Sequence, residues 1–172
     1  MIKRLKFAIV SRSLNRKKLK SSIVFKPPVK NVILVLDSSN IEALPILLQI
    51  KDALNLKESN FNVVLFKNKS ENFPHFNGLT FVEKDLNFFG KFTNKELLNF
   101  SQKNIDLLIT FAEGNNVVTN LFTASCNAAL KIGKDLKNEK FFDVIIRCGN
   151  DVEVFTSEVI KFLKQFKNVK NE

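Results

Sequence analysis

Three acidic residues each follow a predicted strand, at positions where an α/β sheet commonly binds its ligands. Asp37, Glu113 and Asp151 come at or shortly after the ends of three strongly apolar segments. The carboxyl ends of neighbouring parallel strands meet at one edge of a sheet, and ligands bind outside that edge. Three carboxylates gathered there would bind a divalent cation or act as general acid and base. This pattern is typical of a small hydrolase or transferase.

The same three residues also have a structural explanation. Asp, Asn and Ser are favoured where a strand turns into a helix, because their side chains accept hydrogen bonds from the first N–H groups of that helix. The segment Asp37-Ser38-Ser39 lacks the second Asp of a phosphatase-type D-x-D pattern. We therefore expect capping as the principal role, and keep Asp37, Glu113 and Asp151 as catalytic candidates.

Other catalytic signatures are missing from the sequence. It contains no G-x-G-x-x-G, no G-x-x-x-x-G-K-[ST] and no G-x-S-x-G. The single histidine, His75, lies in a segment rich in Pro and Asn. Cys126 and Cys148 lack C-x-x-C spacing and are too few for a disulfide framework, so we expect buried or half-buried thiols in a reducing compartment. The sequence predicts no cofactor and no metal site.

The formal net charge of the chain, +10, is concentrated at its beginning. Residues 1–30 contain ten of the 27 basic residues and no acidic residue, and the remaining 17 basic residues equal the 17 acidic ones. A segment of this kind pairs with polyanions while a neutral domain supplies other contacts. We call residues 1–30 the basic arm; it ends in the linker 26–30, which holds two consecutive prolines, and residues 31–172 form the α/β domain.

Three interpretations of the basic arm remain open: binding to RNA or a ribonucleoprotein, attachment to an anionic membrane surface, and a solvated helix lying along the domain. A membrane helix needs a continuous apolar stripe, and Arg12, Arg16 and Lys20 interrupt the face formed by Ile2, Leu5 and Ile9. Membrane attachment therefore ranks third. The predicted phosphate-binding residues are Lys3, Arg4, Lys6, Arg12, Arg16, Lys17, Lys18 and Lys20.

Alternating strands and helices predict a single three-layer, doubly wound, Rossmann-like α/β domain with a mostly parallel sheet and a basic N-terminal helical arm. Unbroken apolar runs such as 32–36 and 105–111 are typical of strands covered on both faces. A Ser39/Glu42 capping box predicts a helix to about 56, although Pro45 favours a start near Leu44. The predicted strands are 32–36, 61–66, 79–82, 105–111, 130–133 (at an edge) and 142–147, and the other helices are 93–102, 117–128 and 152–166.

A cluster of aromatic residues around Gly90 has two explanations. Phe88-Phe89-Gly90-Lys91-Phe92 would offer a stacking surface beside a cation, as in proteins that bind single-stranded nucleic acid. Packing into the core is the simpler role for Phe88, Phe89 and Phe92, and we expect it to prevail.

Three segments resemble known families: F-V-E-K-D-L-N-F-F-G at 81–90, I-D-L-L-I-T-F at 105–111 and A-S-C-N-A-A-L-K-I-G at 124–133. Together with the basic arm and the last helix, they resemble a family of short basic bacterial α/β proteins of unknown function, which implies a fold but no activity. The second and third segments are also similar to the N-terminal half of heptosyltransferase-type glycosyltransferases. The nucleotide-sugar-binding domain of those enzymes has no counterpart here, and fold similarity alone does not carry function.

We expect a non-catalytic binding or accessory protein that uses its basic arm on RNA or a ribonucleoprotein, with a protein partner also open. The alternatives are a peripheral adaptor on anionic membranes and a small enzyme acting through the three carboxylates. The apolar run at 7–10 is shorter than the roughly 7–15 residues of a secretory signal core. We therefore expect a cytoplasmic protein.

Overall fold

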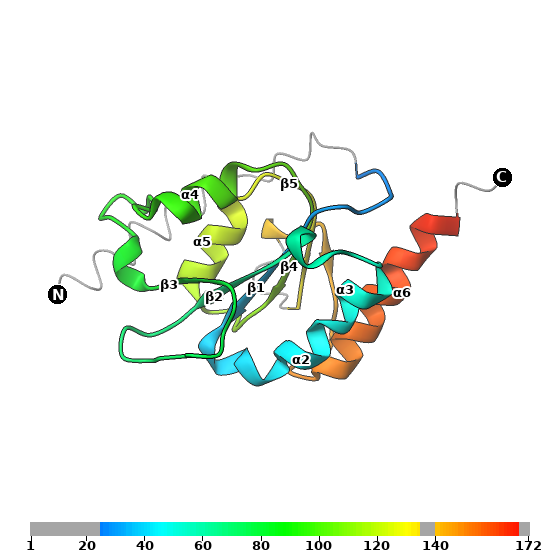
Figure 1. Ribbon diagram of the computed structural model, residues 1–172, viewed down its shortest axis with the longest axis horizontal. Helices are drawn as coiled ribbons and strands as arrows, with labels where there is room; N and C mark the ends of the chain where they lie inside the picture. Colours follow the sequence, from blue (N-terminus) through cyan, green and yellow to red (C-terminus); the bar gives the residue numbers. More distant parts are fainter. Residues whose placement is uncertain (1–24, 135–139, 169–172) are drawn as a thin grey trace.

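The computed structural model describes residues 25–134 and 140–168, which form a parallel sheet between two layers of helices (Figure 1). Its strands are β1 Val32–Asp37, β2 Phe61–Phe66, β3 Leu79–Phe81, β4 Ile105–Phe111, β5 Ala128–Gly133 and β6 Val144–Ile145. Its α-helices are α2 Leu44–Leu47, α3 Gln49–Ala53, α4 Lys95–Gln102, α5 Val117–Ser125 and α6 Val152–Asn168, and the 3₁₀-helices are η1 Ser38–Ala43, η2 Glu58–Asn60 and η3 Glu83–Asp85. The eight predicted phosphate-binding residues lie outside the described residues.

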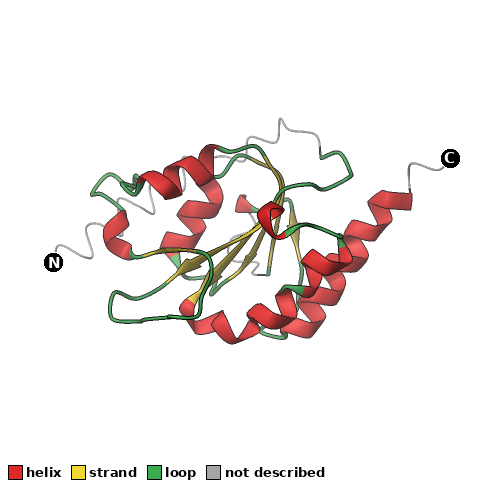
Figure 2. Ribbon diagram, in the orientation of Figure 1, coloured by secondary structure: helices red, strands yellow, loops and turns green. Residues whose placement is uncertain are grey.

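The six strands have the order β3-β2-β1-β4-β5-β6, and every pairing is parallel. Figure 2 shows the sheet with helices on both sides, which confirms the three-layer doubly wound fold. The order reverses at β1, which lies between β2 and β4 although the chain reaches β4 last of the three. In such sheets, the carboxyl edge at this reversal is the usual ligand site.

Both faces of β1 are covered, which explains its unbroken apolar sequence. All six of its residues are buried, and successive side chains point to opposite faces. Ile33 and Val35 pack into the core cluster under α4 and α5, whereas Leu34 and Leu36 pack into the cluster under α2, α3 and α6. Two separate cores therefore hold the sheet between its helices.

The expected Ser39/Glu42 capping box does not form. The Ser39 hydroxyl donates to Asp37 Oδ1 at 2.9 Å, and the chain makes the 3₁₀-helix η1 before α2 begins at Leu44. The alternative start near Leu44 is thus correct, because Pro45 falls in the first turn of α2, where no backbone N–H is needed.

Two other sequence expectations need correction. The helix expected from 93 begins at Lys95, with Asn94 as its N-cap: Asn94 Oδ1 accepts from the backbone N–H groups of Glu96 and Leu97, and the Thr93 hydroxyl donates to the Asp85 carbonyl. The strand expected at an edge, β5, lies between β4 and β6, and the edge strand is β6, which has only two residues.

Candidate functional site

The strand order determines which of the three predicted carboxylates meet. β1 and β4 are neighbours, so Asp37 at the end of β1 and Glu113 after β4 lie side by side at the carboxyl edge. Asp151 follows β6, which is two strands away from β4. Among the described residues, no three His, Cys, Asp or Glu side chains are grouped so as to hold a metal ion.

Asp37 is a buried carboxylate whose two oxygens are both hydrogen-bonded. Its side chain is 3% exposed, and Oδ2 accepts from the backbone N–H of Glu113 at 2.7 Å. Oδ1 accepts from the Ser39 hydroxyl and from the Asn40 amide. Asp37 therefore joins the end of β1 to the turn after β4, across the reversal of the strand order.

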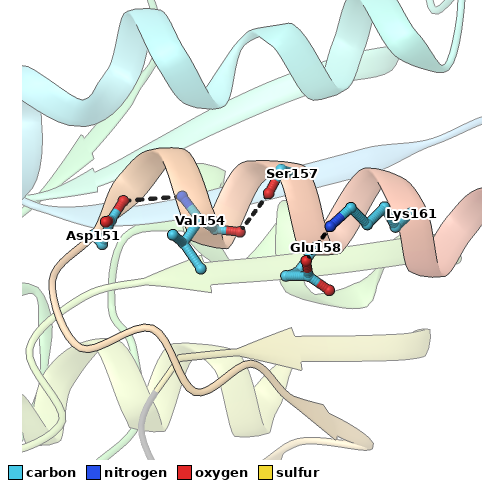
Figure 3. A network of polar contacts seen from close by, with 5 residues as sticks. All are labelled: Asp151, Val154, Ser157, Glu158 and Lys161. Atoms are coloured by element: carbon cyan, nitrogen blue, oxygen red, sulfur yellow. Dashed lines mark hydrogen bonds and ion pairs between the residues drawn. The ribbon is translucent and has the colours of Figure 1, made fainter.

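The other two acidic candidates have different surroundings. Glu113 contributes its backbone N–H to this contact, while the residue itself is exposed. Asp151 is exposed as well, and its Oδ1 accepts from the backbone N–H of Val154 at 2.9 Å (Figure 3). Because Asp151 precedes the first residue of α6, this contact is an N-cap that satisfies one of the free N–H groups of the helix.

Lys134, which the sequence did not suggest, is a buried basic residue at this edge. It follows β5, is 8% exposed, and donates from Nζ to Asn150 Oδ1 at 2.7 Å. The same ammonium group lies 4.4 Å from the centroid of the Phe111 ring, in a cation–π contact. Only the fold could reveal this residue, since in the sequence it is one lysine among many.

Cys148 lies near Lys134 and Asp151 at the same edge. Burial raises the pKa of its thiol, and the electrostatic effect of Lys134, which favours the thiolate, is smaller. Cys148 is therefore a protonated thiol at neutral pH, unlike the low-pKa cysteines that act as nucleophiles. Cys126 is buried in the cluster under α4 and α5, and His75 is exposed in the loop before β3.

The described end of the basic arm is anchored at the opposite, amino edge of the sheet. Asp106 Oδ2 accepts from the backbone N–H groups of Lys30 and Asn31 at 2.7 and 2.9 Å. The Phe25 ring packs edge-on against Phe166 of α6 at a centroid distance of 5.2 Å. The arm therefore joins the domain far from the carboxylates, next to the start of β1 and β4.

A polar groove of about 550 Å³ lies beside α4 and the starts of β2 and β3. Its lining includes the side chains of Asn62, Asn77, Thr80 and Asn94. It also includes two acidic residues: Glu58, whose carboxylate forms an ion pair with Lys51, and Glu96, which is exposed. These amide and hydroxyl groups can donate and accept hydrogen bonds.

The expectation for the aromatic cluster was wrong in part. Phe92 is 6% exposed and belongs to the core, as predicted, but Phe88 and Phe89 are 48% and 76% exposed. Every other phenylalanine of the described residues is buried or half-buried. The signal for this turn lies in Asn87 and Gly90, residue types that favour turns, rather than in the phenylalanines.

In the described part of the chain, no helix has the length and apolar character needed to cross a membrane. No curated protein and no solved structure matches the chain, heptosyltransferases included. Residues 4–166 match the profile of a family of unknown function, DUF6913. Because the match covers almost the whole sequence, the chain belongs to this family.

Proposed function

We propose that this is a non-catalytic binding or accessory protein whose basic arm contacts RNA, free or in a ribonucleoprotein. The separation of charge carries the proposal: residues 1–30 have ten basic and no acidic residues, and residues 31–172 have 17 of each. Lys and Arg bind phosphates and release counterions, which stabilises complexes with any RNA sequence.

The described part of the arm supports this reading. Lys26 and Lys30 are exposed, and the ion pairs found among the described residues join other side chains, Lys51 to Glu58 and Lys161 to Glu158. Asp106 accepts from the backbone of Lys30 rather than from its ammonium group. The two charges can thus face an external partner.

The hydrogen bonding of the carboxylates supports a non-catalytic role. Both oxygens of Asp37 accept bonds that hold the carboxyl edge together, and Asp151 caps α6. A general base must reach its substrate, and the Asp37 side chain is buried. In these positions the side chains of Asp37 and Asp151 stabilise the fold, whereas Glu113 contributes only its backbone N–H.

Fluorescence anisotropy with a labelled oligouridine tests the proposal on the full-length protein. The arm variant replaces Arg16, Lys17, Lys18 and Lys20 by Gln, and a control variant replaces four exposed lysines of the domain. These control positions are Lys57, Lys69, Lys161 and Lys164. Both variants lose the same charge, so a difference between them reports position rather than net charge.

For single strands the slope of log K against log salt is about −0.7 per phosphate contact, so the arm variant should flatten this slope by about 3. The control should change it by less than about 1. Equal effects in the two variants, or wild-type binding by the arm variant, would overturn the proposal. Tighter binding to anionic vesicles than to RNA, lost in the arm variant, would favour the membrane alternative.

A further inference from the structure

Two phenylalanine side chains, Phe88 and Phe89, are exposed to solvent on a short turn. We call Leu86–Phe92 the Phe turn. Among the described residues, Phe88, Phe89 and Val154 are the only exposed large apolar side chains, and two of the three are consecutive in this turn. Exposed aromatic side chains that lie together often mark a binding site.

Hydrogen bonds fix the backbone of the Phe turn. The backbone N–H of Asn87 donates to the Lys91 carbonyl at 2.9 Å, and that of Gly90 donates to the Asn87 carbonyl at 3.1 Å. The Asn87 side-chain oxygen accepts from Phe89 N–H at 2.9 Å and Lys91 N–H at 3.0 Å. Gly90 has a φ of 72°, which glycine adopts at little cost. The two rings are therefore held on a closed turn.

The base of the turn is fixed in the core. Leu86 and Phe92 pair in an antiparallel bridge and are 3% and 6% exposed. The Phe92 ring packs against Phe81 and Phe122 at centroid distances of 6.0 and 5.7 Å. Because folding has already ordered this backbone, the turn itself loses little further entropy when a ligand stacks on the rings.

We propose that the Phe turn stacks bases of single-stranded RNA on Phe88 and Phe89, with Lys91 next to the phosphates. This inference rests on the proposed function, in which the basic arm supplies most of the charge. Lys91 and Lys95 are exposed, and the turn itself contains no acidic residue. Asp85 and Glu96 flank it, and the Asp85 carboxylate accepts from the backbone N–H of Val82. The two ammonium groups beside the rings can attract a phosphate backbone. Aromatic rings beside cations bind single strands irrespective of sequence, since every base has a flat face.

The neighbouring groove favours a nucleic acid over a lipid surface. Asn94, three residues after Lys91, lines the polar groove together with Asn62, Asn77 and Thr80. Two acidic residues, Glu58 and Glu96, belong to the same lining, so the groove suits the uncharged edge of a base rather than a phosphate. Amide and hydroxyl groups recognise the edges of unstacked bases, whereas acyl chains offer them no partner. The Phe turn and this groove thus provide both kinds of contact that a splayed base needs.

The test compares a double variant, Phe88→Leu with Phe89→Leu, with wild type and with Val154→Ala. Leu keeps apolar area and removes the ring, so it separates base stacking from burial in a membrane. Val154, exposed on α6, is the control (Figure 3). Full-length proteins are titrated with labelled oligouridine, with an abasic oligomer of equal length, and with anionic phosphatidylserine vesicles. Far-UV circular dichroism checks that each variant is folded.

We expect wild type and Val154→Ala to bind oligouridine more tightly than the abasic oligomer, by roughly 5- to 150-fold per stacked base. The double variant should lose this preference while keeping the salt slope, which the arm sets. An unchanged preference would overturn the inference and leave the arm proposal standing. The converse result is that the double variant loses the base preference while the arm variant keeps the wild-type affinity and salt slope. That result would overturn only the arm proposal. A third outcome is that wild type shows no base preference and that both wild type and the double Leu variant bind the vesicles. This outcome would assign the turn to membranes and would also overturn the inference.

Discussion

Replacing Asp37 by alanine tests whether this buried carboxylate stabilises the fold. The change removes the acceptor of the Glu113 N–H, a charge-assisted bond between two strand ends with an N–O distance of 2.7 Å. Such a bond contributes roughly 1.5–3 kcal/mol. The bonds from Ser39 and Asn40 are local and partly exposed, and add about 0.5 kcal/mol each because water can replace them. We expect a loss of about 3 kcal/mol in the free energy of unfolding.

Urea unfolding followed by far-UV circular dichroism measures this loss, since the chain has no Trp or Tyr to report by fluorescence. In thermal melts, the same loss lowers Tm by about 6–12 °C. Asp37→Asn keeps one acceptor for the Glu113 N–H and should cost only about 1 kcal/mol.

Glu113→Gln is the matched control, because Glu113 joins this contact through its backbone while the residue is exposed. It should stay within about 0.5 kcal/mol of wild type. If Asp37→Ala is as stable as this control, the Asp37 carboxylate does not stabilise the fold. Its hydrogen bonds would then give no support to a non-catalytic role.

Three further predictions concern other buried groups. Thr156→Val should raise the free energy of unfolding in urea by about 0.5–1 kcal/mol, because the buried Thr156 hydroxyl has no hydrogen-bond partner among the described residues. A loss of stability would mean that this hydroxyl does make a hydrogen bond. Gly133→Ala should lower the free energy of unfolding by about 1–3 kcal/mol in the same assay, because the Cβ of the new alanine would lie 2.6 Å from the buried Phe142 ring. An unchanged stability would mean that the Phe142 ring moves aside freely. Burial raises the pKa of the Cys148 thiol above its ordinary value of 9.0, so Cys148 should react slowly with iodoacetamide at neutral pH in the native protein and faster as the pH rises above that value. The buried Cys126 should react only on unfolding. Rapid labelling of Cys148 at neutral pH would contradict this prediction.

The sequence alone determined the fold class and the position of the strongest strands. Runs such as 32–36 and 105–111 are apolar at every position, which a chain adopts only where helices cover both faces of a sheet. It also determined the separation of charge, because charge is a property of composition and needs no coordinates. The helix start at Leu44 followed from the restriction that Pro45 places on the backbone.

Only the tertiary structure decided which side chains meet. The neighbours of a strand are set by crossovers between distant segments, so the contact of Asp37 with Glu113 and the burial of Lys134 between Phe111 and Asn150 have no local signature. The exposure of Phe88 and Phe89 was decided in the same way. Their apolar character favours burial, but the hydrogen bonds that the Asn87 side-chain oxygen accepts close a turn whose two ends are held in the core, and the rings at its tip are left in solvent.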